Sequence, residues 1–166
     1  DTILYLEGSD AGGHAIHCYR GNIQDNYIES AGNGHGHNLI VNYGSDNTRG
    51  IIRNNTILAH DRNAAIYAHR SDIEDNYMHG IAYGDGWNNH WAIDCPDGYN
   101  IIRNNTIIDF ESGINFDDEW DMTIVDNTIK VRGGYVLYGN NSYGDHIIQN
   151  NICLLYTSPS PRDSDT

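Results

Sequence analysis

An eight-residue pattern recurs along the chain and restricts the folds available to it more than any other feature. It reads GNIQDNYI at 21–28, GIIRNNTI at 50–57, SDIEDNYM at 71–78, NIIRNNTI at 100–107 and MTIVDNTI at 122–129, with a shortened copy, HIIQNNI, at 146–152. The copies align on six asparagines: Asn26, Asn55, Asn76, Asn105, Asn127 and Asn151. Their spacing runs from 21 residues (Asn55 to Asn76) to 29 residues (Asn26 to Asn55), a period typical of solenoid folds.

Apolar residues flank each aligned asparagine at fixed distances. An isoleucine precedes it by three residues in every copy, and an isoleucine or methionine follows by two residues in the first five copies. This pattern predicts two short strands that meet at a tight corner. Asparagine suits such a corner because it tolerates the left-handed backbone region and bonds locally through its side chain. If coils stack at about 4.8 Å, the asparagines are also expected to bond to one another as a ladder.

A third strand is predicted in each repeat. The six segments are HAIHCY at 14–19, NLIVNY at 38–43, AAIYAH at 64–69, WAIDCP at 91–96, SGINFD at 112–117 and YVLYGN at 135–140. Three short strands in each turn indicate an all-β parallel β-helix of about six coils. Leucine-rich repeats are excluded because their leucine pattern is absent, and the apolar runs are too short and too β-branched for helical repeats.

With these repeats, residues 1–152 resemble the right-handed parallel β-helix repeat of the pectin-lyase-like superfamily, a class of carbohydrate-binding proteins and sugar hydrolases, lyases and epimerases. The resemblance implies a right-handed β-helix, a polysaccharide as the partner and an extracellular or periplasmic location. It constrains the fold more than the activity, because one fold supports many functions.

The two ends of the chain depart from the repeat. DTIL at 1–4 matches NTIL at 55–58, which places Asp1 in the asparagine position. At the other end, CLLYTSPSPRD at 153–163 resembles the in-frame translation of a sequencing-library adapter. We therefore expect residues 1–152 to be a β-helix fragment that lacks both caps, and residues 153–166, termed the tail, to be non-native.

The acidic balance of the chain excludes some partners. The formal net charge is −14 at pH 7, and without the tail it is 8 minus 21, or −13. Such a surface argues against nucleic acid and anionic membranes, and it disfavours a polyanionic sugar unless cations mediate. The oligomeric state stays open.

Cys18 and Cys95 occupy equivalent inward positions three coils apart, so we expect both to be unpaired in the core.

Outward positions of the third strand form a candidate binding row. Alternation predicts that His17, Tyr67, Asp94, Asn115 and Tyr138 face outward in successive coils, with His69 and Asp117 two residues further along their strands. The strand in LIVNY at 39–43 is ambiguous by one residue, and a slip would exchange its two faces. In related β-helix enzymes the substrate lies along this kind of groove.

Long loops flank the same row in the first four coils. The step from Met78 to Ile93 is 15 residues, whereas the step from Ile107 to Ile114 is 7. The loops at 29–38 and 79–91 hold His35, Trp87 and Trp91, which we predict to bind sugar rings. Alternatively, the two tryptophans pack the loop onto the barrel and the histidines are solvated turn residues.

Asp94, Asp117 and His69 are the candidate catalytic residues. Asp94 and Asp117 lie one coil and two residues apart, so their Cα atoms should be about 8 Å apart, which suits inverting glycoside hydrolysis. A lyase would instead need charge neutralisation, commonly by Lys or Arg with calcium. No acidic loop has the spacing of a calcium site, and a zinc site from His35 and His37 would lack two of its four ligands. No cofactor is therefore predicted, with calcium the alternative for a lyase.

A second outward column precedes the asparagines. It reads Gln24, Arg53, Glu74, Arg103, Val125 and Gln149, which indicates a surface charge ladder more than a catalytic pair.

Two classes of function thus stay open. The first is an enzyme that hydrolyses or otherwise cleaves a glycan, and the second is a non-catalytic carbohydrate-binding or structural module of an adhesin, surface protein or phage fibre. The irregular long loops favour the enzyme.

Overall fold

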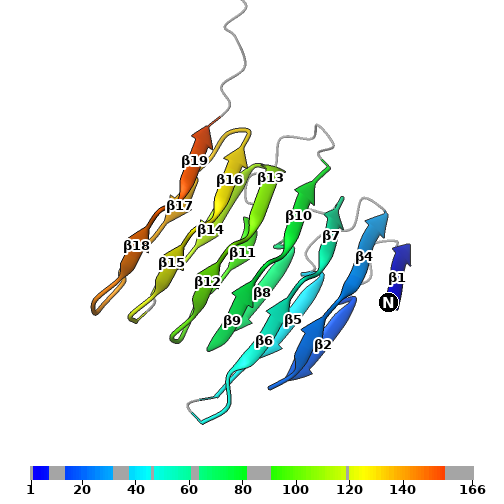
Figure 1. Cartoon of the computed structure of the whole chain (residues 1–166), viewed down its shortest axis with the longest axis horizontal. Coiled ribbons are helices and arrows are strands. Elements are labelled where there is room, and N and C mark those ends of the chain that lie inside the picture. The colour runs from blue at the N-terminus through cyan, green and yellow to red at the C-terminus, as the bar shows by residue number, and fades with distance from the viewer. Residues whose placement is uncertain are drawn as a thin grey trace, which may run out of the picture.

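The chain is a parallel β-solenoid built only of strands in the part that the structure describes. The structure is a computed structural model, and it describes residues 2–7, 14–31, 38–45, 47–60, 64–81, 91–118 and 120–155. The strands stack side by side along one axis (Figure 1). Among the described residues there is no helix long and apolar enough to cross a membrane.

Three sheets of parallel strands form the walls of the solenoid. Sheet A contains β1 (Thr2–Glu7), β4 (Asn26–Ala31), β7 (Thr56–Ala59), β10 (Tyr77–Gly80), β13 (Thr106–Phe110), β16 (Thr128–Val131) and β19 (Ile152–Leu155). Sheet B contains β2 (Ile16–Tyr19), β5 (Ile40–Tyr43), β8 (Ile66–His69), β11 (Trp91–Asp94), β14 (Ser112–Asn115) and β17 (Leu137–Tyr138). Sheet C contains β3 (Asn22–Gln24), β6 (Gly50–Arg53), β9 (Ser71–Glu74), β12 (Ile101–Arg103), β15 (Thr123–Val125) and β18 (Ile147–Gln149).

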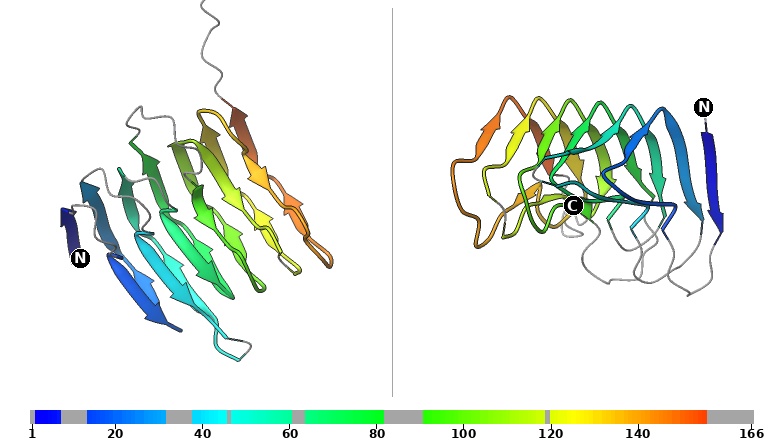
Figure 2. Two further views of the ribbon diagram at one scale, coloured as in Figure 1. Left: turned by 180° about the vertical axis from the view of Figure 1, so that it is seen from behind. Right: turned by 90° about the horizontal axis from the view of Figure 1, so that it is seen from below.

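Each coil takes one strand from sheet B, then one from sheet C and then one from sheet A. Coil 1 is β2, β3 and β4, coil 6 is β17, β18 and β19, and β1 belongs to the coil before coil 1. The view from below shows this stack of similar coils edge on (Figure 2). The predicted parallel β-helix with three short strands in each coil is therefore confirmed.

Columns of isoleucine fill the interior of the solenoid. The isoleucines before each asparagine pair in register across sheet C, and the residues after it pair in register across sheet A. Ile52, Ile57, Ile102 and Ile107 have no exposed surface, as expected for the contents of a closed core. The repeat therefore encodes burial directly, because each pair of apolar residues faces inward from two adjacent walls.

At the corner between sheets C and A, two adjacent polar residues have different structural roles. The first residue adopts the left-handed backbone, with φ between 53° and 58° at Asp25, Asn54, Asp75, Asn104, Asp126 and Asn150. The second is the aligned asparagine, and its amide bonds along the stack. Asp and Asn are among the few residues that accept positive φ at low cost, which explains the Asp or Asn that precedes every aligned asparagine.

The predicted asparagine ladder is continuous from Asn26 to Asn151. Each amide nitrogen donates to Oδ1 of the next asparagine at 2.9–3.0 Å, and each backbone N–H donates to the same oxygen at 3.0–3.1 Å. The amide nitrogens from Asn55 onward also donate to the carbonyl of an isoleucine one coil earlier. These bonds satisfy polar groups that the corner would otherwise bury unpaired.

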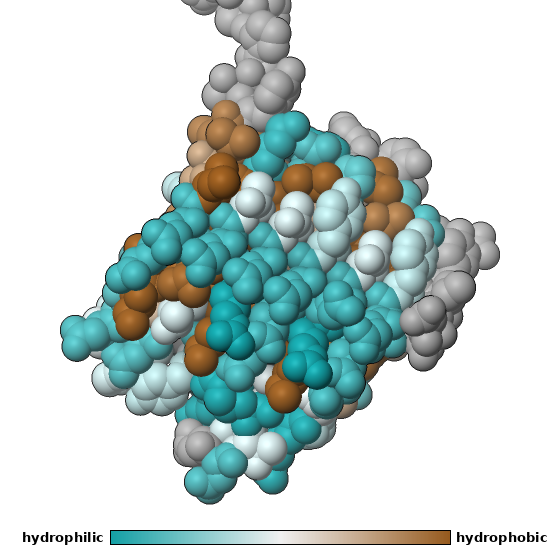
Figure 3. Space-filling view, in the orientation of Figure 1, coloured by the Kyte–Doolittle hydropathy of each residue, from teal (hydrophilic) through white to brown (hydrophobic). Residues whose placement is uncertain are grey.

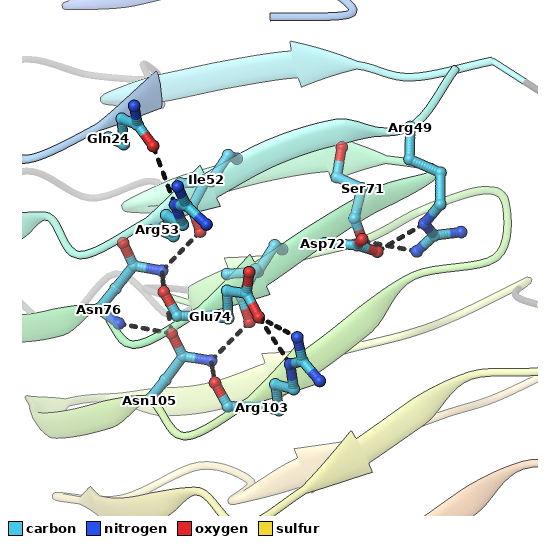
Figure 4. A network of polar contacts seen from close by, with 11 residues as sticks. Gln24, Arg49, Ile52, Arg53, Ser71, Asp72, Glu74, Asn76, Arg103 and Asn105 are labelled. Atoms are coloured by element: carbon cyan, nitrogen blue, oxygen red, sulfur yellow. Dashed lines mark hydrogen bonds and ion pairs between the residues drawn. The ribbon is translucent and has the colours of Figure 1, made fainter. Parts of the chain in front are cut away.

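Sheet C carries the predicted charge column on its outer surface. Nε of Arg53 donates to Oε1 of Gln24 at 2.9 Å, and Nε of Arg103 donates to Oε2 of Glu74 at 2.6 Å (Figure 4). Arg49, at the corner before β6, contacts Asp72 at 2.5 Å and also donates to two backbone carbonyls. In the space-filling view the outer surface of sheet C is largely hydrophilic, whereas that of sheet A mixes hydrophilic, intermediate and hydrophobic residues (Figure 3).

The two ends differ from the sequence-based expectation. At the start, Thr2 pairs with Asn26 and Leu4 with Ile28, so the alignment of Asp1 with the asparagines is wrong by one residue. At the other end, β19 continues three residues into the tail, and Cys153 pairs with Ile129 and Leu155 with Val131. Strand β19 thus spans the proposed boundary at 152/153, and the non-native origin of the tail stays a prediction. Residues 156–166 lie outside the described ranges.

Candidate functional site

The outward row predicted on sheet B forms in the expected register. His17 pairs with Val41, Val41 with Tyr67, Tyr67 with Asp94, Asp94 with Asn115, and Asn115 with Tyr138. In coil 2 the ambiguity is resolved, because Ile40 and Asn42 are buried in line with Ile66 and Ala68, which leaves Val41 in the outward row. Sheet B lies behind sheets A and C in Figure 1 and is seen from the other side in Figure 2, left.

Aromatic rings cover sheet B over coils 1–3. Tyr19 and Tyr43 stack with ring centroids 5.3 Å apart and an interplanar angle of 25°. Tyr43 also contacts His69 at 4.8 Å and Tyr67 at 6.1 Å. His17 lies 5.7 Å from Tyr43 and 5.4 Å from His14. We call these six rings the first aromatic surface: His14, His17, Tyr19, Tyr43, Tyr67 and His69.

The candidate carboxylates follow in coils 4 and 5. Nδ2 of Asn115 donates a hydrogen bond of 2.9 Å to Oδ1 of Asp94. Burial raises the pKa of Asp94, the bond from Asn115 opposes that effect, and the charge of Asp117 adds to the rise. Asp117 lies two residues beyond Asn115 and is partly buried. A carboxyl with a raised pKa, held by a neighbour and facing a second carboxylate, has the features of a general acid.

Several buried polar atoms on this face have no hydrogen-bond partner. They are Nε2 of His69, Oδ1 of Asn115 and Oδ1 of Asp117. Buried polar atoms are usually paired, so these atoms, in coils 3 and 5 on either side of the coil of Asp94, are unusual among the described residues. Each of these atoms has almost no exposed surface, so a ligand group would reach it only after the side chain turns outward.

His69 stands between the first aromatic surface and the carboxylates. Its Nδ1 lies 3.9 Å from Oδ2 of Asp97, at the limit of an ion pair. Burial lowers the pKa of His69, Asp97 counters this, and the charge of Arg70 lowers it further. The imidazole is therefore favoured in its neutral form, which suits a proton acceptor or a neutral contact to a ligand.

A second group of rings lies beyond the carboxylates. The Trp91 ring is stacked on that of Tyr135 with centroids 6.5 Å apart, and it lies 5.9 Å from the ring of Tyr138. Tyr135 and Tyr138 contact each other at 4.9 Å. We call these three residues the second aromatic surface. The predicted site residues Trp91 and Tyr138 thus come together in space.

Two predicted sugar-binding residues, His35 and Trp87, lie outside the described residues, as does the proposed zinc pair of His35 and His37. Within the described ranges, no group of three or more His, Cys, Asp or Glu side chains could hold a metal ion. Sequence reasoning missed Tyr19, Tyr43 and Tyr135. Tyr19 and Tyr43 could have been found by following the outward parity two residues past His17 and Val41.

Cys18 and Cys95 do not contribute to this face. Neither forms a disulfide bond with a described residue, Cys95 is buried, and Sγ of Cys18 lies 3.7 Å from Oδ1 of Asn42 inside the coil. Cys95 lies in the core and Cys18 packs against it, so the predicted inward positions are confirmed.

Comparison of the chain with protein-family models, with curated proteins and with solved structures gives no match. The parallel β-helix therefore rests on strand register and hydrogen bonds alone.

Proposed function

We propose that the outward face of sheet B binds a polysaccharide, and that Asp94 and Asp117 hydrolyse it. The observation that carries this proposal is the position of Asp94, a partly buried carboxyl with a raised pKa between two groups of aromatic rings. The pectin-lyase-like resemblance of the repeat points to the same class of ligand.

The aromatic rings support sugar binding. Sugar rings present C–H faces that pack on aromatic rings, and tyrosine adds a hydroxyl at the edge of the contact. Tyr19 has 73% of its surface exposed and Tyr135 has 57%, so both rings are available to a ligand. Aromatic side chains as exposed as these gain little from the protein itself, and a bound sugar would cover them.

The two carboxylates support cleavage by inversion. Strand spacing across one coil and along two residues corresponds to about 8 Å between the Cα atoms of Asp94 and Asp117. Carboxyl groups held at a similar separation would leave room for a water molecule between them. In this mechanism Asp94, protonated, donates its proton to the glycosidic oxygen. Asp117, ionised, takes a proton from water as the water attacks the sugar from the opposite side.

Asn115 and His69 would position these groups. The bond from Asn115 would fix the orientation of the Asp94 carboxyl. Neutral His69 lies on the same face, where it could contact a sugar hydroxyl. A polymeric substrate that cannot cross a membrane would meet the protein in the extracellular space or the periplasm.

The test is a screen of neutral and acidic polysaccharides for binding and for new reducing ends. Asp94→Asn and Asp117→Asn should each lower turnover by about 100-fold or more while binding persists. Asp109→Asn is the matched control, because Asp109 lies beside His79 and Lys130 on sheet A, away from the rings of sheet B. Failure to bind any polysaccharide would overturn the proposal, and binding without products would leave the non-catalytic module.

A further inference from the structure

The charges around sheet B restrict which polysaccharide it accepts. Among the described residues, no Lys or Arg lies on a strand of this sheet. Carboxylates do lie along it, with Asp94 on β11, Asp97 three residues later and Asp117 just after β14. The face therefore combines aromatic rings with negative charge.

Five cations of the described chain lie on the sides of sheets A and C and contact neighbours there. Arg49, Arg53 and Arg103 belong to sheet C or its entrance and bond to neighbours there (Figure 4). On the side of sheet A, Arg132 donates to the carbonyl of Gly80 at 3.0 Å, and Lys130 lies 3.9 Å from Asp109.

Two more arginines, Arg20 and Arg70, sit at the tight corners that leave β2 and β8 for sheet C. A polyuronate on sheet B would thus place its carboxylates among carboxylates, with no strand-borne cation to compensate them.

The unpartnered atoms of the face point the same way. Oδ1 of Asn115 and Oδ1 of Asp117 are acceptors without a donor, although both side chains are partly exposed. A sugar hydroxyl supplies the missing donor, whereas an ionised carboxylate is only an acceptor. Polyuronates also carry hydroxyl groups, but a neutral polymer with a hydroxymethyl group in place of each carboxylate offers one additional donor per sugar.

We infer that the face of sheet B selects an uncharged, hydroxyl-bearing polysaccharide and rejects polyuronates. This inference rests on the proposed function, since it names the substrate class of the same site. Selection arises from repulsion by Asp97 and Asp117 together with the smaller number of donors that a polyuronate offers, while ring stacking contributes affinity to either polymer.

A matched pair of polymers tests the inference on the intact chain. One is polygalacturonate, and the other is the same polymer after its carboxylates have been reduced to primary alcohols, so only the charge and the donor count differ. Binding is measured in the Asp94→Asn variant, to prevent cleavage, from 20 to 500 mM salt with a chelator present. We expect the reduced polymer to bind at least about 10-fold more tightly at low salt, with affinity independent of salt. Any residual binding of polygalacturonate should strengthen as salt screens the repulsion.

Asp97→Asn supplies a second readout without touching the proposed acid or base. It should raise the affinity for polygalacturonate by roughly 2- to 5-fold, because one repelling charge at the surface has been removed, and leave the reduced polymer unaffected. Asp25→Asn, at the exposed corner between sheets C and A, is the matched control and should change neither.

Three outcomes separate the two proposals. Equal or tighter binding of polygalacturonate, or its binding only when calcium replaces the chelator, overturns the charge selection but leaves a polysaccharide site. Binding that Tyr43→Ala does not weaken places the sugar elsewhere and overturns the inference. Absence of binding to any polysaccharide, neutral or acidic, overturns the proposed function itself.

Discussion

The side-chain amide of Asn115 holds the carboxyl of Asp94 across adjacent coils of sheet B, through a hydrogen bond of 2.9 Å. The bond lowers the pKa of Asp94, but burial raises it more strongly, so the folded protein retains the proton to a higher pH than the unfolded chain does. The contribution of Asp94 to stability therefore decreases as pH rises through its raised pKa.

Asp94→Asn should remove this pH dependence. The variant cannot ionise at this position, so its free energy of unfolding should exceed that of the wild type increasingly as pH rises through the pKa of Asp94 in the folded protein. Below the pKa of an unfolded aspartate the difference should become constant, because the wild-type carboxyl is then protonated in both states. Urea titrations across the acid and neutral range measure this directly. A difference that stays constant with pH would contradict the burial of an ionisable Asp94.

Asn115→Ala should enlarge the pH dependence of stability that Asp94→Asn removes. Without the amide the ionised carboxylate loses its donor, so the pKa of Asp94 rises further. The loss of stability, which begins near the pKa of an unfolded aspartate in both proteins, should extend to higher pH and become larger. If Asp94 is also the general acid, the alkaline limb of the pH–rate profile should shift upward in parallel. A shift in one measurement without the other would separate the structural role of Asn115 from its role in catalysis.

Asn105→Ala should be among the most destabilising single substitutions in the solenoid. Oδ1 of Asn105 accepts two bonds from Asn76, and its amide nitrogen donates to Asn127 and to the carbonyl of Ile73. Removal leaves several buried groups unpaired, at about 1–3 kcal/mol each, so we expect a loss of about 3 kcal/mol or more in chemical unfolding.

The neighbouring residue provides the control for Asn105. Asn104 is exposed and has a φ of 55°, so Asn104→Gly should change the unfolding free energy by less than about 1 kcal/mol. Similar losses in the two variants would mean that the corner, and not the ladder, stabilises the coil.

Two arginines of sheet C should differ in their effect on stability. Arg49 donates to the carbonyls of Ser71 and Tyr99 as well as to Asp72, and it joins three segments. Arg103 pairs with Glu74 on the exposed surface. Arg103→Gln should therefore cost at most about 1 kcal/mol and less at high salt, whereas Arg49→Gln should cost more and retain most of its effect in salt. Equal, fully salt-screened losses would show that the backbone contacts of Arg49 add nothing.

Leu154→Glu should reduce self-association. Leu154 is 52% exposed on β19, the strand at the edge of sheet A, next to exposed Ile152, where a brown patch adjoins the grey trace (Figure 3). Exposed apolar edge strands template contact with other chains, and a carboxylate opposite Lys130 would oppose this. Light scattering over a range of concentrations is the measurement. Thr128→Glu, on the adjacent strand, leaves the apolar edge intact and should not have the same effect.

The solenoid could be predicted from the sequence because each position of the repeat has a single physical role. Inward isoleucines and the outward row from His17 to Tyr138 follow from alternation once Ile16, Ile66 and Ile93 are aligned. The split between a left-handed residue and a ladder asparagine was not predictable from Asn-Asn pairs, since either residue could fill either role.

Register at the ends was harder to predict for a different reason. DTIL and NTIL share three of four letters, yet Thr2 pairs with Asn26, and among the described strands β1 pairs with β4 alone. In the tail, Cys153 and Leu155 alternate with Leu154 as a strand requires, so backbone pairing continues irrespective of where the residues came from. The aromatic surfaces depend on contacts between strands of different coils, which single-strand patterns do not contain.

The asparagine ladder also has a direction. Every carboxamide oxygen from Asn55 to Asn151 points to the preceding coil and every amide nitrogen from Asn26 to Asn127 points to the following one, so the side-chain dipoles add head to tail along the axis. Aligned amides polarise one another and leave opposite partial charges at the two ends of a row. The Asn151 end is therefore the electropositive pole and attracts carboxylates or carbonyl oxygens, while the Asn26 end is electronegative and attracts donors. Two such solenoids placed end to end would attract in one orientation and repel in the other.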